Sequence, residues 1–370
     1  MLLSGANICY YLLDKGHLSV QSFIDGDFSV HFSPSRNNNF IINKAASNPL
    51  FVKQARNQDW EKQETLRHEA TCYWLANNEP EYGNLKRFLP QYFEYDYINH
   101  ILVLEYLQHA VPLDEYYAQA GVFPAVLAEK KAELLASYHK DIFTKIKNGR
   151  SFSLFKQSIP AVFMLVGNRQ KFWTDGNNAA ERQMLELIND EPQFTRLVGE
   201  VKESWQATSL IHSDIKAANF LISINASHGS ATDNLRLIDW EMADIGDPCW
   251  DVAAVFQMYF ISWIYSELND GPGSNNPQSS MYYHKLLPAI RHFWDSYCGH
   301  MNYSAGQAEE NLLKTMNFCA LKLIHTCFES TTTSEHLPPS SAKMLQLSLN
   351  MLKSPEEAIQ TLLDMELYVK

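Results

Sequence analysis

The sequence has few cysteines and no paired cysteine motif. Its 370 residues include six cysteines, scattered without a C-x-x-C pair. Disulfide frameworks and zinc sites depend on closely spaced cysteines, so both are disfavoured and we expect buried free thiols. The six are Cys9, Cys72, Cys249, Cys298, Cys319 and Cys327.

Long apolar runs are also missing. The apolar stretches are far shorter than the roughly 20 residues that span a bilayer. The first residues, Met1 to Gly5, do not begin a basic and apolar targeting signal. We therefore expect a cytoplasmic protein without a membrane partner.

Basic residues are outnumbered by acidic ones. The chain has 30 Lys and Arg against 42 Asp and Glu, a net charge of −12 at pH 7. Nucleic-acid binding depends largely on basic contacts to phosphate, so a nucleic-acid partner is disfavoured. The negative charge would suit a cationic substrate, although many acidic proteins carry such a charge for solubility alone. A hydrophobic content of 46% is typical of a globular protein, and the length allows one large domain or two lobes.

Residues 211–251 concentrate the side chains that carry chemistry. The stretch contains IHSDIKAANFLIS, a polar connection, and LRLIDWEMADIGDPCWD. Transfer of a γ-phosphoryl group to an alcohol needs a carboxylate beside the hydroxyl and oxygen ligands for Mg²⁺. Asp214 suits the first role, and Asn219 and Asp239, at adjacent strand ends, suit the second. Lys216 can neutralise the transferring phosphate.

The motifs HSDxKxxN, IDWE and GDPxWD, in this order, resemble the aminoglycoside phosphotransferase and choline kinase superfamily. The resemblance implies a two-lobed protein kinase-like fold of the α+β class. A small N-lobe would hold an antiparallel sheet and one main helix, and a large C-lobe would be mostly helical. The resemblance also implies that Asp214 is the catalytic base, that Asn219 and Asp239 bind Mg²⁺, and that Asp251 braces the catalytic loop. His212 is then expected to support this loop as well.

The N-lobe is expected to contain strands around SVQSFI, FSVHFSP, FIINK and LFVKQ, followed by an amphipathic helix in QETLRHEATCYWLA. By the same resemblance, Lys53 in the last strand holds the ATP phosphates and pairs with Glu69 in the helix. A short helix from Ser4 to Gly16, capped by Ser4, precedes these strands.

Residues 35–39, SRNNN, lie where protein kinases carry a glycine-rich loop, but they include no glycine. Asparagine tolerates left-handed backbone and offers an amide, so Asn37 and Asn38 are assigned to the phosphates. The alternative is a plain hairpin turn.

The strands PQYFEYD and HILVLEYL complete the N-lobe, and the second ends at Glu105 and Leu107, where the backbone is expected to meet adenine. We accordingly place the nucleotide-binding lobe at residues 1–107 and the C-lobe at 108–370. In the C-lobe, His139 is expected to be a buried structural histidine near the end of a long helix. Residues 268–280 are expected to form a loop, and the rest of the lobe is expected to be helical.

Three functions are compatible with these features. The Asp-x-Lys arrangement favours an ATP- and Mg²⁺-dependent kinase for Ser or Thr of a peptide. The chain also resembles stand-alone kinases of ribosomal, lanthipeptide-type peptide pathways, in which a separate lyase follows. The second function is a small-molecule kinase for an aminoglycoside, amino alcohol or sugar. The third is a pseudokinase, which the joint presence of Lys53, Glu69, Asp214, Asn219 and Asp239 argues against. Glu241 is either a second metal contact or a surface acid.

Overall fold

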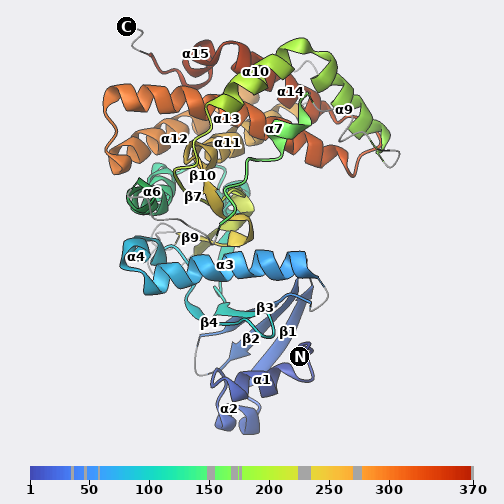
Figure 1. Ribbon diagram of the computed structural model, residues 1–370, viewed down its shortest axis with the longest axis vertical. Coiled ribbons are helices and arrows are strands. Elements are labelled where there is room, and N and C mark those ends of the chain that lie inside the picture. The colour runs from blue at the N-terminus through green and yellow to red at the C-terminus, as the bar shows by residue number, and fades with distance from the viewer. Residues whose placement is uncertain are drawn as a thin grey trace. The chain divides into compact units, whose positions relative to one another are not determined.

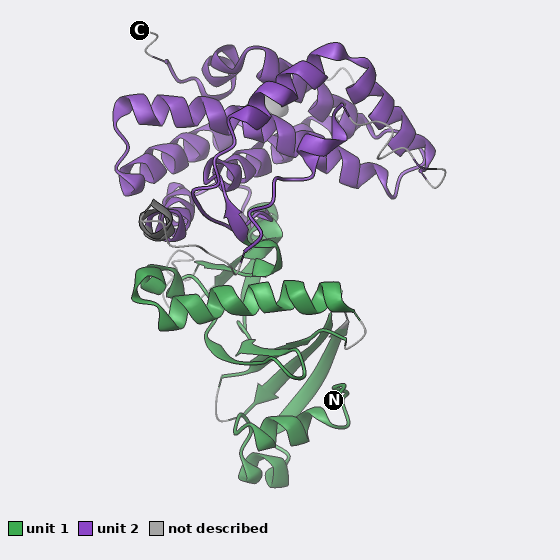
Figure 2. Ribbon diagram, in the orientation of Figure 1, with its two compact units in different colours: residues 1–118, 217–243 green, residues 119–216, 244–370 purple. Residues whose placement is uncertain are grey.

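The structure is a computed structural model that describes residues 1–34, 37–45, 48–56, 59–147, 155–167, 174, 177–223, 235–269 and 277–367. The chain forms two compact units, Met1–Ala118 with Ala217–Ala243, and Gln119–Lys216 with Asp244–Lys370 (Figure 2). We call them unit 1 and unit 2. Each unit is assembled from two segments, because the chain crosses from unit 2 into unit 1 at residues 216–217 and returns at 243–244.

A five-stranded antiparallel sheet is the centre of unit 1 (Figure 1). Its order is β1-β2-β3-β5-β4, and the strands are β1 (Phe28–Pro34), β2 (Asn38–Lys44), β3 (Leu50–Gln54), β4 (Tyr92–Asp96) and β5 (Ile101–Glu105). Burial alternates along β3, where Leu50, Val52 and Gln54 are buried while Phe51 and Lys53 are partly exposed. Successive side chains of a strand point to opposite faces, so Lys53 lies on the face opposite Val52.

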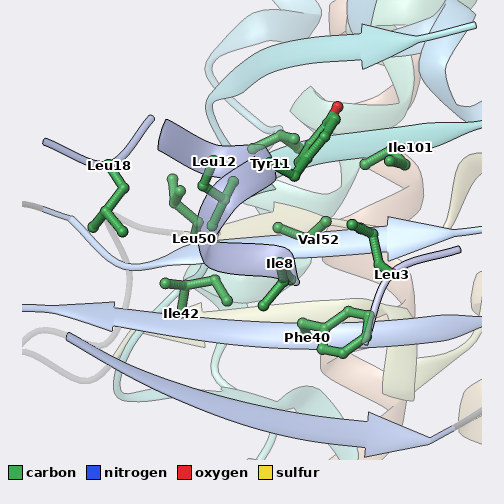
Figure 3. Packing of buried hydrophobic residues seen from close by; sticks show 11 residues of the cluster. Leu3, Ile8, Tyr11, Leu12, Leu18, Phe40, Ile42, Leu50, Val52 and Ile101 are labelled. Carbon is green, nitrogen blue, oxygen red and sulfur yellow. The ribbon is translucent and has the colours of Figure 1, made fainter. Parts of the chain in front are cut away.

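An N-terminal helical segment covers the Val52 face of the sheet. The helices are α1 (Ile8–Asp14) and α2 (Val20–Asp25), and apolar side chains of α1 pack on β2, β3 and β5 (Figure 3). Gln54 fastens this segment, since its buried side chain accepts from the N–H of Leu3 at 2.7 Å and donates to the carbonyl of Met1 at 2.8 Å.

Two predictions for this segment were wrong in detail. SVQSFI is the helix α2 and not a strand, because the side chain of Ser19 caps the N–H of Ser22 and Gly26, with φ of 64°, ends the helix. The first helix begins at Ile8. Ser4 contributes its backbone carbonyl to that turn, accepting from the N–H of Ile8 at 3.0 Å, instead of a side-chain cap.

The helix α3 (Trp60–Asn78) carries Glu69 toward Lys53, and Asp59 caps its first turn. Unit 1 continues with η1 (Pro80–Tyr82), α4 (Gly83–Lys86), β6 (Ala110–Pro112) and most of α5 (Leu113–Ala120), whose last two residues belong to unit 2. Its second segment adds η2 (Ala217–Asn219), β8 (Phe220–Ser223), β9 (Leu235–Leu237) and η3 (Trp240–Met242). The strands β6, β8 and β9 form a small antiparallel sheet.

Unit 2 is mostly helical. Its centre is α11 (Cys249–Asn269), which is buried around most of its circumference and packs against α12 and α13. The short strands β7 (Ser209–Ile211) and β10 (Asp244–Gly246) pair before α11 begins. The other helices are α6 (Ala125–Lys147), α7 (Val162–Leu165), α9 (Ala179–Asp190), α10 (Pro192–Glu203), α12 (Pro277–Met301), α13 (Ala305–Thr331), α14 (Pro339–Lys353), α15 (Pro355–Ala358) and the π-helical η4 (Ile359–Leu363).

The α+β class, with an antiparallel sheet in a small N-terminal part and a mostly helical remainder, is confirmed. Two finer predictions are corrected. His139 lies inside α6, which continues to Lys147. The bounds predicted for the loop 268–280 were wrong, because Leu268 and Asn269 still belong to α11 and residues 277–280 already belong to α12. Residues 270–276 lie outside the described residues.

The structure also bears on the cysteines and on the apolar segments. All six cysteines carry free thiols, as expected. Among the described residues, no helix combines the length and apolar character needed to cross a membrane.

Candidate active site

Lys53, Glu69 and Asp239 meet in unit 1. The ammonium of Lys53 donates to both carboxylate oxygens of Glu69 at 2.9 Å and to Oδ1 of Asp239 at 3.1 Å. Glu69 is buried, whereas 32% of the Asp239 side chain is exposed. The expected pair of Lys53 with Glu69 is therefore present. The contact of Lys53 with Asp239 was missed from the sequence, because 186 residues separate the two and no local pattern joins them.

The ammonium of Lys53 and the two carboxylates stabilise each other's charges. Burial alone would lower the pKa of Lys53, but the carboxylates of Glu69 and Asp239 hold it above its ordinary value. Burial raises the pKa of Glu69, and the charge of Lys53 opposes that rise. A buried ion pair costs desolvation and is retained only with close hydrogen bonds, which all three distances provide. Glu241 lies close enough for its charge to act on Glu69.

The backbone of Asp239 is left-handed. It lies between β9 and the 3-10 helix η3 and has φ of 70° and ψ of 54°. Such a conformation is uncommon for a residue other than glycine and is costly unless its surroundings hold it. Here the next residue, Trp240, is fully buried and donates from its ring N–H to the carbonyl of Leu237 at 3.2 Å. The turn therefore directs the Asp239 carboxylate toward Lys53.

Asn219 and Asp239 belong to neighbouring segments of unit 1. The N–H of Ile238 donates to the backbone carbonyl of Asn219 at 3.0 Å, so the two side chains project from adjoining stretches of backbone. The described residues contain no group of three or more His, Cys, Asp or Glu side chains able to hold a metal ion. One carboxylate and one amide oxygen fit Mg²⁺, which commonly takes few protein ligands and completes its shell with phosphate and water oxygens.

Asn37 and Asn38 lie at the start of β2. Both are buried, and Asn38 pairs with Pro34 of β1 and Gln54 of β3. The asparagine-rich loop expected from the sequence is thus corrected in part, because Asn38 is already a strand residue. Ser35 and Arg36, which complete the expected loop, lie outside the described residues.

The chain leaves the sheet after β5 through Glu105 and Leu107. The carboxylate of Glu105 accepts from the N–H of Gln91 at 3.1 Å, and so its side chain stabilises the end of the sheet. The N–H of Tyr106 donates to the carbonyl of Pro49 at 2.8 Å, and the carbonyl of Leu107 accepts from Ala110 at 3.3 Å. The N–H of Leu107 donates to no backbone carbonyl of the described residues.

Asp214 and Lys216 belong to unit 2, where they follow β7. The ammonium of Lys216 donates to Oδ2 of Asp214 at 2.6 Å. Both side chains are well exposed, at 37% for Asp214 and 53% for Lys216. The neighbouring His212 is fully buried, as expected for a histidine that supports the loop.

Asp251, in the first turn of α11, holds residues 212–216, the loop expected from the sequence to be catalytic. Its carboxylate accepts from the N–H of His212 at 2.6 Å, from the N–H of Ser213 at 3.0 Å and from the hydroxyl of Tyr138 at 2.7 Å. Burial would raise the pKa of Asp251, but its interactions with His139 and the loop lower it, so the carboxylate stays ionised. The role of Tyr138 was missed from the sequence, where this residue looks like an ordinary core position of a helix.

His139 is a structural histidine, as predicted. It is fully buried in α6, with Nδ1 2.8 Å from the hydroxyl of Tyr297 and Nε2 3.6 Å from Oδ2 of Asp251. Its carbonyl accepts from the hydroxyl of Ser209 in β7 at 2.8 Å. These contacts connect α6 with the strand that leads into the catalytic loop.

The predicted site residues thus form two groups. Unit 1 contains Lys53, Glu69, Glu105, Leu107, Asn37, Asn38, Asn219 and Asp239, and unit 2 contains Asp214 and Lys216. Within unit 1 the structure brings Lys53, Glu69 and Asp239 into direct contact. Within unit 2 it brings Asp214 and Lys216 into contact.

Solved structures similar to this chain share its fold at low sequence identity. The ethanolamine kinase of Plasmodium vivax is 12% identical, with a TM-score of 0.52 over 96% of this chain and 88% of the kinase. The ADP-bound aminoglycoside phosphotransferase APH(2'')-Ib is 13% identical, with a TM-score of 0.52 over 94% and 99%. The GDP complex of aminoglycoside 2'-phosphotransferase-IIIa is 14% identical, with a TM-score of 0.50 over 95% and 99%. The fold is therefore protein kinase-like.

A comparison with curated protein sequences found no match. The model of the phosphotransferase enzyme family, by contrast, matches residues 32–271, which is more than half of the chain. This stretch includes Lys53, Glu69, Asp214, Asn219 and Asp239. The chain belongs to the phosphotransferase enzyme family, and it is a kinase that acts on hydroxyl groups.

Proposed function

We propose that the protein transfers the γ-phosphoryl group of ATP to an alcohol hydroxyl with the help of Mg²⁺. The observation that carries the proposal is the contact of Lys53 with both Glu69 and Asp239 in unit 1. This ammonium is held by two carboxylates from distant parts of the chain, which positions a cationic hydrogen-bond donor for phosphate oxygens. ADP-bound and GDP-bound relatives of the same fold support a nucleotide donor.

Each residue then has a defined role. Asp214 accepts the proton of the acceptor hydroxyl, whose oxygen forms a bond to the γ-phosphorus as the bond between that phosphorus and the β-γ bridging oxygen breaks. Lys216 offsets charge on the transferring group. Lys53 contacts the α- and β-phosphates, and Asn219 and Asp239 supply oxygen ligands. When bound, Mg²⁺ neutralises negative charge on the phosphates.

The remaining assignments concern nucleotide binding. We propose that the backbone at Glu105 and Leu107 binds adenine, since the side chain of Glu105 is already engaged with Gln91 and the Leu107 N–H has no backbone acceptor among the described residues. Asn37 and Asn38 would approach the phosphates from the start of β2.

We propose a peptide Ser or Thr as the acceptor. Lys216 supports this, because a lysine two residues after the catalytic aspartate, here ion-paired with it at 2.6 Å, is the arrangement typical of Ser/Thr kinases. In a ribosomal peptide pathway a separate lyase would then eliminate the phosphate. A small-molecule acceptor is the second candidate, and the similarity in fold to an ethanolamine kinase and to aminoglycoside phosphotransferases favours it.

The two acceptor classes are separated by mass spectrometry. Purified protein is incubated with ATP and Mg²⁺, once with a panel of Ser/Thr-containing peptides and once with a panel of aminoglycosides and amino alcohols. Gain of about 80 Da, one phosphoryl group, on a peptide supports the first candidate. Gain on a small molecule supports the second and contradicts the first. No gain on either panel, together with no ATP consumption, contradicts the proposed function.

Two substitutions test the roles of the aspartates. Asp214→Asn should keep binding of ATP and Mg²⁺ but lower transfer by about a hundredfold or more, because the proton acceptor is lost. Asp239→Asn should weaken Mg²⁺-dependent ATP binding. Asp295→Asn, at an exposed position of α12, is the matched control and should change neither. Transfer at the wild-type rate in either test variant would contradict the role given to that residue.

A further inference from the structure

Lys322 of α13 is a buried lysine whose ammonium lies beside the catalytic loop of the same unit. Only 6% of the residue is exposed. Its Nζ donates to the backbone carbonyl of Ser213 at 3.4 Å and lies 4.1 Å from the centre of the Trp250 ring. Burying an ammonium is costly unless hydrogen bonds and aromatic contacts replace its water. The surroundings must therefore hold Lys322 in this position.

The neighbouring contacts are suited to that task. The amide of Gln257 in α11 donates to the backbone carbonyl of Lys322 at 2.8 Å and to the hydroxyl of Thr326 at 2.6 Å, which fixes this turn of α13 against α11. The ring of Trp250 is itself fixed by three aromatic neighbours, whose centroids lie 5.8 to 6.2 Å away, namely Phe163, Trp205 and Phe318.

The peptide unit that receives this hydrogen bond is strained. Ser213 has φ of 67°, a left-handed conformation that residues other than glycine rarely adopt. Its N–H donates to Asp251, and its carbonyl accepts from Lys322. Two oppositely charged side chains therefore hold the two polar groups of one residue. A peptide unit is planar and includes the Cα of the next residue, so fixing the carbonyl of Ser213 also fixes the direction in which Asp214 leaves the loop.

We propose that Lys322 is a positioning residue, whose ammonium, seated on Trp250, holds the carbonyl of Ser213 and thereby orients the carboxylate of Asp214. The role of Asp214 in this statement rests on the proposed function. Lys322 acts through the loop, in contrast to Lys216, which contacts the carboxylate itself. Asp251 and Lys322 together keep the left-handed turn, one from its N–H side and the other from its carbonyl side.

The charges around Lys322 predict how its effect depends on pH. Burial lowers the pKa of Lys322 to about 8, although nearby acidic groups raise it. The ammonium is therefore lost as the pH rises through about 8, and the hold on Ser213 should weaken there. The ionisable groups that act on Lys322 come from the catalytic loop, from α11 and from its own helix, and they are Asp214, Asp251, Cys319, His325 and Glu329.

Hydrogen exchange tests whether Lys322 holds the loop at Ser213, and it needs no phosphoryl-acceptor substrate. In the full-length protein, amides of the segment 209–216 should exchange about tenfold faster in Lys322→Met than in the wild type, because a hydrogen bond from a charged donor is lost. Lys322→Arg keeps a positive charge and should restore protection. Lys343→Met, which removes an exposed ion pair of α14 with Glu267 and does not contact Ser213, should leave this segment unchanged. Unchanged exchange in Lys322→Met would overturn the proposal.

Kinetics test the consequence for Asp214. With the acceptor identified by the mass-spectrometry panels, Lys322→Met should lower kcat about 10- to 100-fold while the Kd for ATP stays the same. Wild-type kcat should decline at alkaline pH, and Lys322→Arg should show no such decline because guanidinium stays charged. If Lys322→Met lowered ATP affinity as much as kcat, the positioning role would be contradicted. An equal decline of kcat at alkaline pH in the wild type and in Lys322→Arg would contradict it as well. Absence of transfer by the wild type would overturn the proposed function, while the exchange experiment would still decide whether Lys322 holds the loop.

Discussion

Replacing Lys131 by methionine is expected to stabilise the protein at neutral pH. Lys131 lies in α6 with none of its surface exposed, and its ammonium donates to the hydroxyl of Tyr259 in α11 at 2.6 Å. It also lies 4.4 Å from the centre of the Tyr259 ring. Burial lowers the pKa of Lys131 from its usual 10.5 to about 7. The amine of Lys131 is therefore harder to protonate in the folded state than in the unfolded state.

The size of the effect follows from the shift in pKa. Each pKa unit corresponds to about 1.4 kcal/mol, so the shift of Lys131 corresponds to a cost of about 5 kcal/mol. Below about pH 7 this cost is fully present. Between that pH and 10.5 the unfolded state binds more protons than the folded state, so the free energy of unfolding rises with pH and the cost disappears. Methionine removes the cost but leaves the Tyr259 hydroxyl without its donor, a loss of about 2 kcal/mol. The net gain should be about 3 kcal/mol at neutral pH.

Urea unfolding followed by circular dichroism measures this difference. Wild type and Lys131→Met are compared from neutral to alkaline pH, and the advantage of the variant should shrink as the pH rises. Lys130→Met is a matched control, since the neighbouring Lys130 is partly exposed and pairs with Glu133, so its loss should change stability by less than about 1 kcal/mol. A Lys131→Met variant that is less stable at neutral pH, or a difference independent of pH, would refute this reasoning.

Three further predictions concern the candidate site and its charge. Glu69→Gln leaves Asp239 as the remaining carboxylate that contacts Lys53, and titration calorimetry should show about tenfold weaker binding of ATP with Mg²⁺; unchanged affinity would contradict the role of the pair. Asp251→Ala leaves two backbone N–H groups of the catalytic loop without their acceptor and should cost about 3 to 5 kcal/mol in thermal unfolding, whereas Asp295→Ala should cost little. If the net charge of −12 guides a cationic acceptor, its KM should rise with added salt, and a flat response would remove that explanation.

Much of the fold could be predicted from local sequence patterns. The strands β2 to β5 and the helices α3, α5 and α6 follow from alternation and helical spacing. Prediction from these patterns failed where a short apolar segment fits both the alternation of a strand and the spacing of a helix. SVQSFI, for example, has too few residues to distinguish a strand from the helix α2, and the cap by Ser19 decides the outcome.

The candidate site could be predicted in so far as its residues are encoded in compact motifs. The pair of Lys53 and Glu69, which lie 16 residues apart on a strand and the helix that follows it, was expected from the family resemblance. The loop residues His212 to Asn219 were expected from one short motif. The contact of Lys53 with Asp239 was not, because it depends on a left-handed turn that places a residue 186 positions away beside the sheet.

The buried lysines show where sequence patterns stop carrying information about function. Lys131 and Lys322 both occupy positions within amphipathic helices, where the spacing indicates only that neighbouring side chains form a core. Both are buried, and burial lowers the pKa of each. Their partners differ, because the ammonium of Lys131 meets a tyrosine of α11 while that of Lys322 meets the backbone beside Asp214. Removal of the first should therefore stabilise the protein, whereas removal of the second should disturb the loop that holds the proposed catalytic base. Whether removing Lys322 is harmful depends on its contact with Ser213, which lies 109 residues away in sequence and can be found only in the folded structure.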